Sequence, residues 1–297
     1  MKIKWNALIF TVFFLFSPAS HGADSPLNIH VSILPQQFFV RQITGDLARV
    51  SVLVKPGKSP ATYSPTPAQV KALTSAQIYF RIGVPFENGF LHRVEDMAKG
   101  VTIVDTRRGI HLRHMAGTDH DHGHGHDHGE EGGDPHIWMD PKLVQQQAST
   151  MLTALVKLSP EHADVFTANY KKFISGLEAL HVDISNRLAP LKGKRLFVFH
   201  PSFGYFTHAY GLEQVAVEHM GKAPKGKDLA RIIKWVKKEK ARVIFVQPQF
   251  DAHAAQNIAS AIQGGVVSID PLAYDYMENM THMADTIFQY LTPAPKG

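Results

Sequence analysis

A repeated alternation of short apolar runs with amphipathic helical stretches is the feature of the sequence that most limits the possible folds. In the first half, helical patterns from Gln36 and over 67–75 separate apolar runs at 29–34, 50–54, 78–82 and 101–104. The alternation restarts near residue 196, with apolar runs at 196–199, 215–217, 243–246 and 266–269 and helical patterns at 203–210, 228–240, 252–263 and 277–291. Alternating strands and helices build a mostly parallel sheet covered by helices, so the sequence predicts two small α/β units.

One long amphipathic helix is expected between the two units. Apolar side chains recur from Phe166 to Leu188 at spacings of three and four residues, which keeps them on one helical face. At 1.5 Å per residue, a helix over 159–190 is roughly 45 Å long, which is longer than most helices inside one small domain. We therefore predict an N-terminal α/β lobe over 23–158, a connecting helix over 159–190 and a C-terminal α/β lobe over 191–297.

Proline marks two of the expected helix starts. Asp140 precedes Pro141, and Ser159 precedes Pro160, so each pair has the pattern of an N-cap followed by proline at the first helical position. The first pair predicts a helix to about Leu158, and the second predicts the start of the long helix.

The N-terminus has the pattern of a secretory signal. Lys2 and Lys4 precede an apolar run over 7–16, and small residues follow to about Gly22, where cleavage is expected. The apolar run is too short for a membrane-spanning helix, which needs roughly 20 residues. The chain has no cysteine, so neither lipid attachment through a thiol nor a disulfide is available. We expect a periplasmic protein that has lost residues 1–22 and is not a lipoprotein.

The charge balance is too weak to indicate nucleic-acid binding. Loss of the signal leaves 29 basic residues against 26 acidic ones, a net charge of about +3. Lysines at 234, 237, 238 and 240 are typical of the solvated face of a helix. A monomer without nucleic acid is expected.

Histidine is the unusual component of the sequence: there are 18, of which eight lie between His111 and His136. Glycine and acidic residues separate the densest set, so the segment 111–133 is expected as an exposed loop without a core of its own. Neutral imidazole suits Zn²⁺, Cu²⁺ and Ni²⁺, which predicts a metal-collecting role, against the alternative of a merely polar linker. The collecting residues are His120, His122, His124, His126 and His128.

Three other residues are candidates for a specific metal site. In open α/β sheets ligands bind beyond the carboxyl ends of the strands, where His200 follows the run 196–199 and Asp270 follows the run 266–269. His136 lies in a proline-containing turn before a helix start. Each has a structural alternative: a lone histidine is often only hydrogen-bonded, and Asp270 could form a turn or cap a helix. Spacing in the sequence does not show that the three converge.

Several separated motifs resemble those of the metal-specific solute-binding proteins of ABC importers, the ZnuA/TroA family. Residues 134–141, Asp-Pro-His-Ile-Trp-Met-Asp-Pro, resemble the family's second metal-ligand segment. Residues 200–206, His-Pro-Ser-Phe-Gly-Tyr-Phe, are similar to the third, in which histidine marks the zinc-type members and glutamate the manganese-type ones. Asp270 resembles the aspartate of the family's fourth metal-ligand segment. A histidine-rich loop is typical of the zinc branch of the family. The resemblance covers nearly the whole mature chain.

The segment that resembles the family's first ligand departs from it. The family has a histidine within proline-histidine-x-tyrosine, but residues 60–63 read Pro-Ala-Thr-Tyr, and Ala61 has no donor atom. Water, a histidine between His120 and His128, or a bidentate Asp270 could fill the position. His136 and His200 favour Zn²⁺ over Mn²⁺, because nitrogen ligands suit zinc whereas Mn²⁺ prefers carboxylates.

The resemblance implies two lobes that hold one Zn²⁺ in the cleft between them, through His136, His200 and Asp270, for delivery to a permease in the inner membrane. Two alternatives remain open at the level of sequence. A zinc-dependent hydrolase also uses three ligands and an open position, although no His-Glu-x-x-His motif is present. The sequence also does not distinguish a component of an importer from a periplasmic zinc buffer or chaperone without a transporter.

Overall fold

The computed structural model describes residues 25–115, 133–218, 226–250 and 252–292. The expected signal segment 1–22 and the five collecting histidines of the loop lie outside the described residues. No helix of the described part combines the length and apolar character needed to cross a membrane.

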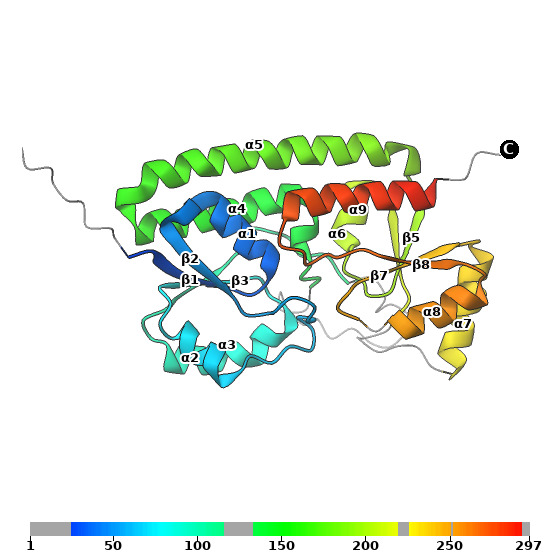
Figure 1. The fold of residues 1–297 in the computed structure, drawn as a ribbon, viewed down its shortest axis with the longest axis horizontal. Coiled ribbons are helices and arrows are strands. Elements are labelled where there is room, and N and C mark those ends of the chain that lie inside the picture. Colours follow the sequence, from blue (N-terminus) through cyan, green and yellow to red (C-terminus); the bar gives the residue numbers. More distant parts are fainter. Residues whose placement is uncertain (1–24, 116–132, 219–225, 251, 293–297) are drawn as a thin grey trace, which may run out of the picture.

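The first half forms a four-stranded parallel sheet in the order β2-β1-β3-β4 (Figure 1). Its strands are β1 (Leu27–Val31), β2 (Ala48–Val52), β3 (Ile78–Arg81) and β4 (Thr102–Asp105). The helices between them are α1 (Leu34–Thr44), α2 (Pro67–Leu73) and α3 (Pro85–Met97). The predicted run 29–34 is divided, because β1 ends at Val31 and Leu34 already opens α1 with proline in its first turn.

The second half repeats this arrangement as a parallel sheet in the order β6-β5-β7-β8. Its strands are β5 (Arg195–Val198), β6 (Glu213–Ala216), β7 (Val243–Val246) and β8 (Gly265–Ser268). The helices are α6 (Gly204–Ala209), α7 (Gly226–Lys238), α8 (Ala252–Ala261) and α9 (Tyr276–Leu291). Two small parallel sheets with flanking helices are therefore confirmed. Each expected strand run of the sequence contributes to one of them.

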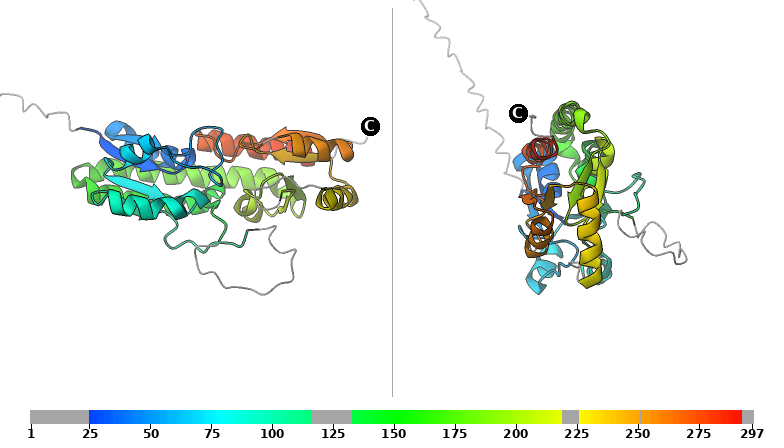
Figure 2. Two further views of the ribbon diagram at one scale, coloured as in Figure 1. Left: turned by 90° about the horizontal axis from the view of Figure 1, so that it is seen from below. Right: turned by 90° about the vertical axis from the view of Figure 1, so that its right-hand side faces the viewer.

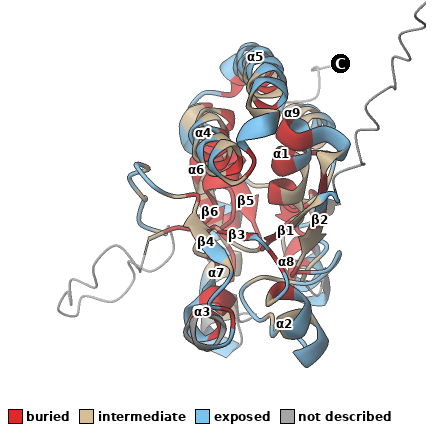
Figure 3. Cartoon of the chain, turned by 90° about the vertical axis from the view of Figure 1, so that its left-hand side faces the viewer, coloured by how far each residue is buried: buried red, intermediate tan, exposed pale blue. Residues whose placement is uncertain are grey.

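The long helix α5 (Ala163–Leu188) lies along one side of the molecule and extends over both halves (Figures 1 and 2). It packs against α1 and α4 (Pro141–Leu158) in the first half and against α9 in the second. Its buried side chains are those of the predicted apolar face: Phe166, Phe173, Leu177, Leu180, Ile184 and Leu188. Figure 3 shows the outward face of α5 exposed and its inward face buried.

Both helix starts marked by proline form at the predicted positions, but only the first is capped by a side chain. The Asp140 carboxylate accepts a hydrogen bond from the Lys142 N–H at 2.8 Å, and Pro141 opens α4. Ser159 instead ends α4, and a 3₁₀ turn over Pro160–His162 precedes α5. The Ser159 hydroxyl bonds to the side chains of Glu161 and His162 rather than to a backbone N–H, so it does not cap the long helix.

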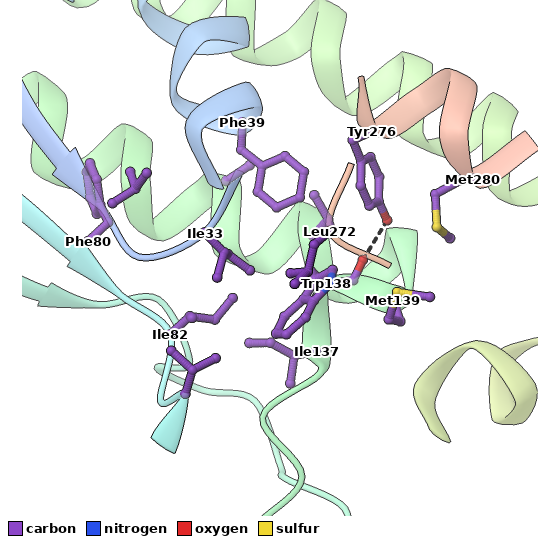
Figure 4. Close-up of a cluster of buried hydrophobic side chains, with 14 of the residues drawn as sticks. Ile33, Phe39, Phe80, Ile82, Ile137, Trp138, Met139, Leu272, Tyr276 and Met280 are labelled. Atoms are coloured by element: carbon purple, nitrogen blue, oxygen red, sulfur yellow. Dashed lines mark hydrogen bonds between the residues drawn. The ribbon is translucent and has the colours of Figure 1, made fainter. Parts of the chain in front are cut away.

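The hydrophobic core is continuous between the two halves. Figure 4 shows Ile33 and Phe39 from the first half close to Leu272 and Tyr276 from the second, with Trp138 beside Leu272. Trp138 is 1% exposed and belongs to the 3₁₀ turn η3 (Ile137–Met139). This packing brings the segment around His136 against the carboxyl edge of the second sheet.

A buried carboxylate organises the carboxyl end of the first sheet. Glu87, at the start of α3, is fully buried and accepts hydrogen bonds from the N–H groups of Ile82 at 3.0 Å and Gly83 at 2.7 Å. The Ser32 hydroxyl also donates to it, at 2.5 Å, and the Ser32 oxygen lies 2.6 Å from the Tyr79 hydroxyl. Burial raises the pKa of Glu87 above its ordinary value of 4.5, although these donors oppose the shift.

Replacing Glu87 by glutamine is expected to lower the free energy of unfolding by about 1–3 kcal/mol, because an amide group would face backbone N–H donors. The difference in the free energy of unfolding between the wild type and Glu87→Gln should depend on pH. A raised pKa in the folded state means that the carboxyl stabilises the fold fully below its unfolded pKa, and that this contribution is lost as pH rises through the folded value.

Urea unfolding of the wild type and Glu87→Gln at several pH values above 4.5 measures this difference. Its decrease with rising pH is the expected result. A pH-independent or increasing difference contradicts the assignment of the shift to burial.

Candidate metal centre

His136 is held in a turn by the aspartate two residues before it. The Asp134 Oδ1 atom accepts a hydrogen bond from the His136 backbone N–H at 3.0 Å and lies 2.7 Å from the ring Nδ1. Asp134 is 1% exposed and His136 is 8% exposed. The motif Asp-Pro-His is therefore a local device that fixes the backbone and the ring of the histidine together.

His200 follows β5 at the carboxyl edge of the second sheet and faces His136. The centroids of the two imidazole rings are 5.4 Å apart, at an interplanar angle of 72°. The Phe250 ring stacks on His200, with centroids 4.6 Å apart, and the Trp138 ring lies 5.1 Å from that of His136. The structure thus brings together two of the three predicted ligands inside aromatic walls.

Each ring has a carboxylate at Nδ1. For His200 it is Glu218, whose Oε1 lies 2.5 Å from Nδ1. An ionised carboxylate only accepts hydrogen bonds, so these contacts place the ring hydrogen on Nδ1 and leave Nε2 of each neutral imidazole with a free lone pair. Burial lowers the pKa of His200 below its ordinary value of 6.5, while the bond to Glu218 opposes the shift. Neutral imidazole is the form that binds a metal ion.

Three hydrogen bonds hold the His136 segment against the second half. The Trp138 indole N–H donates to the Pro271 carbonyl at 2.7 Å, and the Tyr276 hydroxyl donates to the Trp138 carbonyl at 2.8 Å. The Tyr205 hydroxyl donates to the Asp134 carbonyl at 3.0 Å and accepts from the Arg113 N–H at the same distance. Burial raises the pKa of Tyr205 to about 12, so its hydroxyl remains a donor at neutral pH.

Asp270 lies beyond the end of β8, and its carboxylate is engaged in a turn. The Asp270 Oδ1 accepts from the Leu272 N–H at 2.9 Å and from the Gln249 side-chain amide at 2.7 Å. Among the described residues, no three His, Asp or Glu side chains are grouped closely enough to hold one metal ion. The structure pairs His136 with His200 and does not bring Asp270 into one group with them. The role of Asp270 as a ligand stays a prediction.

A small cavity of about 40 Å³ lies beside Asp270, between the two halves. It is lined by the segment from Val54 to Lys58 of the first half and by Gln249, Asp270 and Leu272 of the second. Ala61 follows a few residues later in that segment, in an exposed turn where its N–H donates to the Ser59 hydroxyl at 3.3 Å. The segment 60–63 that resembles the family's first ligand therefore begins two residues after the last lining residue of the first half, Lys58.

Sequence reasoning missed the residues that support the histidines. Glu218 follows β6, and Gln247 follows β7. The Gln247 amide accepts from the His200 N–H at 3.2 Å and donates to the His200 carbonyl at 2.7 Å. No sequence signal marks them: their place beside His200 follows from the strand register, in which Val198 pairs with Ala216 and with Phe245.

The chain is similar to known proteins over most of its length. A family model described as zinc-uptake complex component A, periplasmic (ZnuA), matches residues 29–290. The chain is 29% identical over 263 residues to the high-affinity zinc uptake system protein ZnuA of Paracoccus denitrificans, covering 78% of this chain and 79% of that protein. It is 26% identical over 273 residues to the Bacillus subtilis protein of the same name, covering 87% and 86%.

Solved structures give the same picture. A zinc-bound deletion mutant of ZnuA matches with a TM-score of 0.83 and 35% identity, covering 91% of this chain and 100% of that one. The periplasmic zinc-binding protein TroA of Treponema pallidum matches with a TM-score of 0.78 at 20% identity, covering 91% and 100%. The second likeness concerns the fold alone.

Replacing Trp138 by phenylalanine should lower the free energy of unfolding by about 2 kcal/mol or more, because it removes a buried hydrogen bond and leaves a void. Trp235, which is 36% exposed on α7, provides the matched control, and Trp235→Phe should cost less than about 1 kcal/mol. Urea unfolding followed by far-ultraviolet circular dichroism measures both. Equal losses in the two variants would contradict a special role for Trp138 at the junction.

Proposed function

We propose that this chain, which belongs to the ZnuA family of periplasmic zinc-uptake components, captures Zn²⁺ between its two halves and delivers it to an ABC-type permease in the inner membrane. The observation that carries the proposal is the facing pair His136 and His200, each with a carboxylate at Nδ1. Members of this family are uptake components rather than enzymes, so the hydrolase alternative is set aside.

The donor set fits zinc. Two imidazole nitrogens from separate segments suit Zn²⁺, whereas Mn²⁺ prefers oxygen ligands. We propose Asp270 as the third ligand, since a carboxylate has about four lone-pair positions and Oδ1 uses two of them in the turn. Water or a further side chain completes the tetrahedral arrangement that Zn²⁺ favours.

Delivery follows from the position of the ligands on both sides of the boundary. An ion bound to both His136 and His200 stabilises one arrangement of the two halves, by the free energy of its binding. A permease that contacts both halves distinguishes the loaded protein from the empty one. Because α5 packs against helices of both halves, the change between the two states is a small tilt rather than a wide opening.

The setting of this function is the periplasm. The N-terminal pattern supports secretion with removal of residues 1–22, and the absence of cysteine supports a protein without a lipid anchor. The protein acts as a monomer, and it binds no nucleic acid. The five histidines from His120 to His128 act as a collector that raises the zinc concentration near the cleft.

Replacing His136 or His200 by alanine is expected to weaken the tightest zinc equivalent by more than about 100-fold, because each supplies one ligand nitrogen. Weaker zinc binding by the collecting histidines should remain. His282→Ala, a change at an exposed position of α9, is the control and should bind as the wild type does. Titration against competing chelators measures the three variants. An unchanged tight phase in His200→Ala overturns the assignment of the site.

Delivery itself needs a separate test, because a zinc buffer or chaperone would bind the ion equally well. With a candidate permease reconstituted in vesicles, the zinc-loaded protein should stimulate ATP hydrolysis and His200→Ala should not. Tight zinc binding without stimulation of any permease encoded beside it would favour the buffer.

Replacing Ala61 by histidine is expected to tighten zinc binding about tenfold, because a fixed nitrogen ligand would replace a solvent ligand. The adjacent Thr62→His serves as the control for simply adding an imidazole to the exposed turn. Chelator competition measures both variants. Equal affinities of Ala61→His and the wild type would mean that this turn does not provide a ligand position.

A further inference from the structure

His200 is flanked on both sides by residues of neighbouring strands. In the second sheet, β5 lies between β6 and β7, and Val198 pairs with Ala216 of β6 and Phe245 of β7. Two residues beyond this row, the same spacing places Glu218 and Gln247 on either side of His200. Backbone bonds continue the pairing past the strand ends, because the Glu218 N–H donates to the Phe199 carbonyl at 3.0 Å.

The two neighbours hold different parts of His200. Gln247 is fully buried, and its amide bonds both the N–H and the carbonyl of His200, which fixes the backbone. Glu218 contacts only the ring, at Nδ1. The direction of the Nε2 lone pair therefore depends on the backbone set by Gln247 and on the ring hydrogen accepted by Glu218.

Burial of Glu218 calls for a functional reason. Its side chain is 1% exposed, and its Oε2 has no hydrogen-bond partner among the described residues. The same is true of Asp134 Oδ2 beside His136. A buried carboxylate that bonds only through one oxygen is costly unless a positive charge lies nearby. A divalent cation held at Nε2 of the two imidazoles would supply that positive charge close to both carboxylates.

We propose that Glu218 is a positioning residue for His200: it holds the ring with its hydrogen on Nδ1 and its Nε2 directed to the metal ion. The inference rests on the proposed zinc site and extends it to a residue that no sequence motif marks. Mutation of a carboxylate that bonds the far ring nitrogen of a ligand histidine typically weakens metal binding by about 10–100-fold.

Glu218→Gln tests the role of the carboxylate with little change of shape. An amide can present either its oxygen or its NH₂ group to Nδ1, so the preference for one ring tautomer is lost. Glu213→Gln, on the strand β6 that precedes Glu218, is the matched control, because Glu213 is 58% exposed and bonds Arg195 outside the site. Zinc affinity by chelator competition should fall about 10–100-fold in Glu218→Gln and stay unchanged in Glu213→Gln.

A spectroscopic measurement separates positioning from a general loss of structure. In zinc-free protein at pH 8, the ¹⁵N shifts of the His200 ring, assigned by their absence in His200→Ala, should report hydrogen on Nδ1 in the wild type. Glu218→Gln should show a mixture that includes hydrogen on Nε2. The two arms use the whole chain, and circular dichroism of each variant checks that it is folded. Should Glu218→Gln fail to fold, Asp134→Asn provides the same comparison for the His136 ring.

A wild-type ring tautomer together with wild-type zinc affinity in Glu218→Gln would overturn the proposal, while the zinc site itself would stand. An affinity loss with an unchanged His200 tautomer would also overturn it, since the effect would not pass through the ring. Failure of the wild type to bind zinc tightly would refute the proposed function instead, whatever the tautomer of His200.

Discussion

Parallel pairing of the strands is the constraint on which the geometry of the centre depends. Parallel strands all end at the same edge of their sheet, so residues far apart in the sequence meet there at positions set by register. The row that contains Val198 determines which residues surround His200. Because parallel sheets are buried on both faces, the same constraint requires the covering helices and hence the alternating sequence.

The second requirement is that a residue from outside the second sheet reaches this edge. His136 does so because Trp138 is anchored, by its indole N–H to Pro271 and by its carbonyl to Tyr276. The Trp138 and Tyr276 side chains thus hold the two halves together, and this packing places His136 opposite His200.

Much of the fold follows from the sequence because burial of apolar strands and of one helix face is a local, periodic signal. The strand runs and the apolar face of α5 were predictable for this reason. The 3₁₀ turn over Pro160–His162 that precedes α5 was not, and neither were the bonds of Ser159 to Glu161 and His162 in place of a side-chain cap. Strand order and register could not be predicted from the sequence either, because they depend on contacts between segments that are far apart in the chain.

The site was predictable in part. His136 and His200 carry recognisable motifs, and the structure pairs them. Glu218 carries none: an acidic residue after a short strand looks like any exposed turn residue until the register places it beside His200. For Asp270 the turn former was one of the alternatives, and its carboxylate does bond the Leu272 N–H.

The donors around the centre are nitrogen and oxygen atoms only, and the chain contains no sulfur ligand of the thiolate type. Thiolate sites release zinc when oxidants convert their cysteines to disulfides or sulfenic acids. Imidazole and carboxylate groups do not undergo that chemistry. Metal retention in the proposed site would therefore not depend on the redox potential of its surroundings.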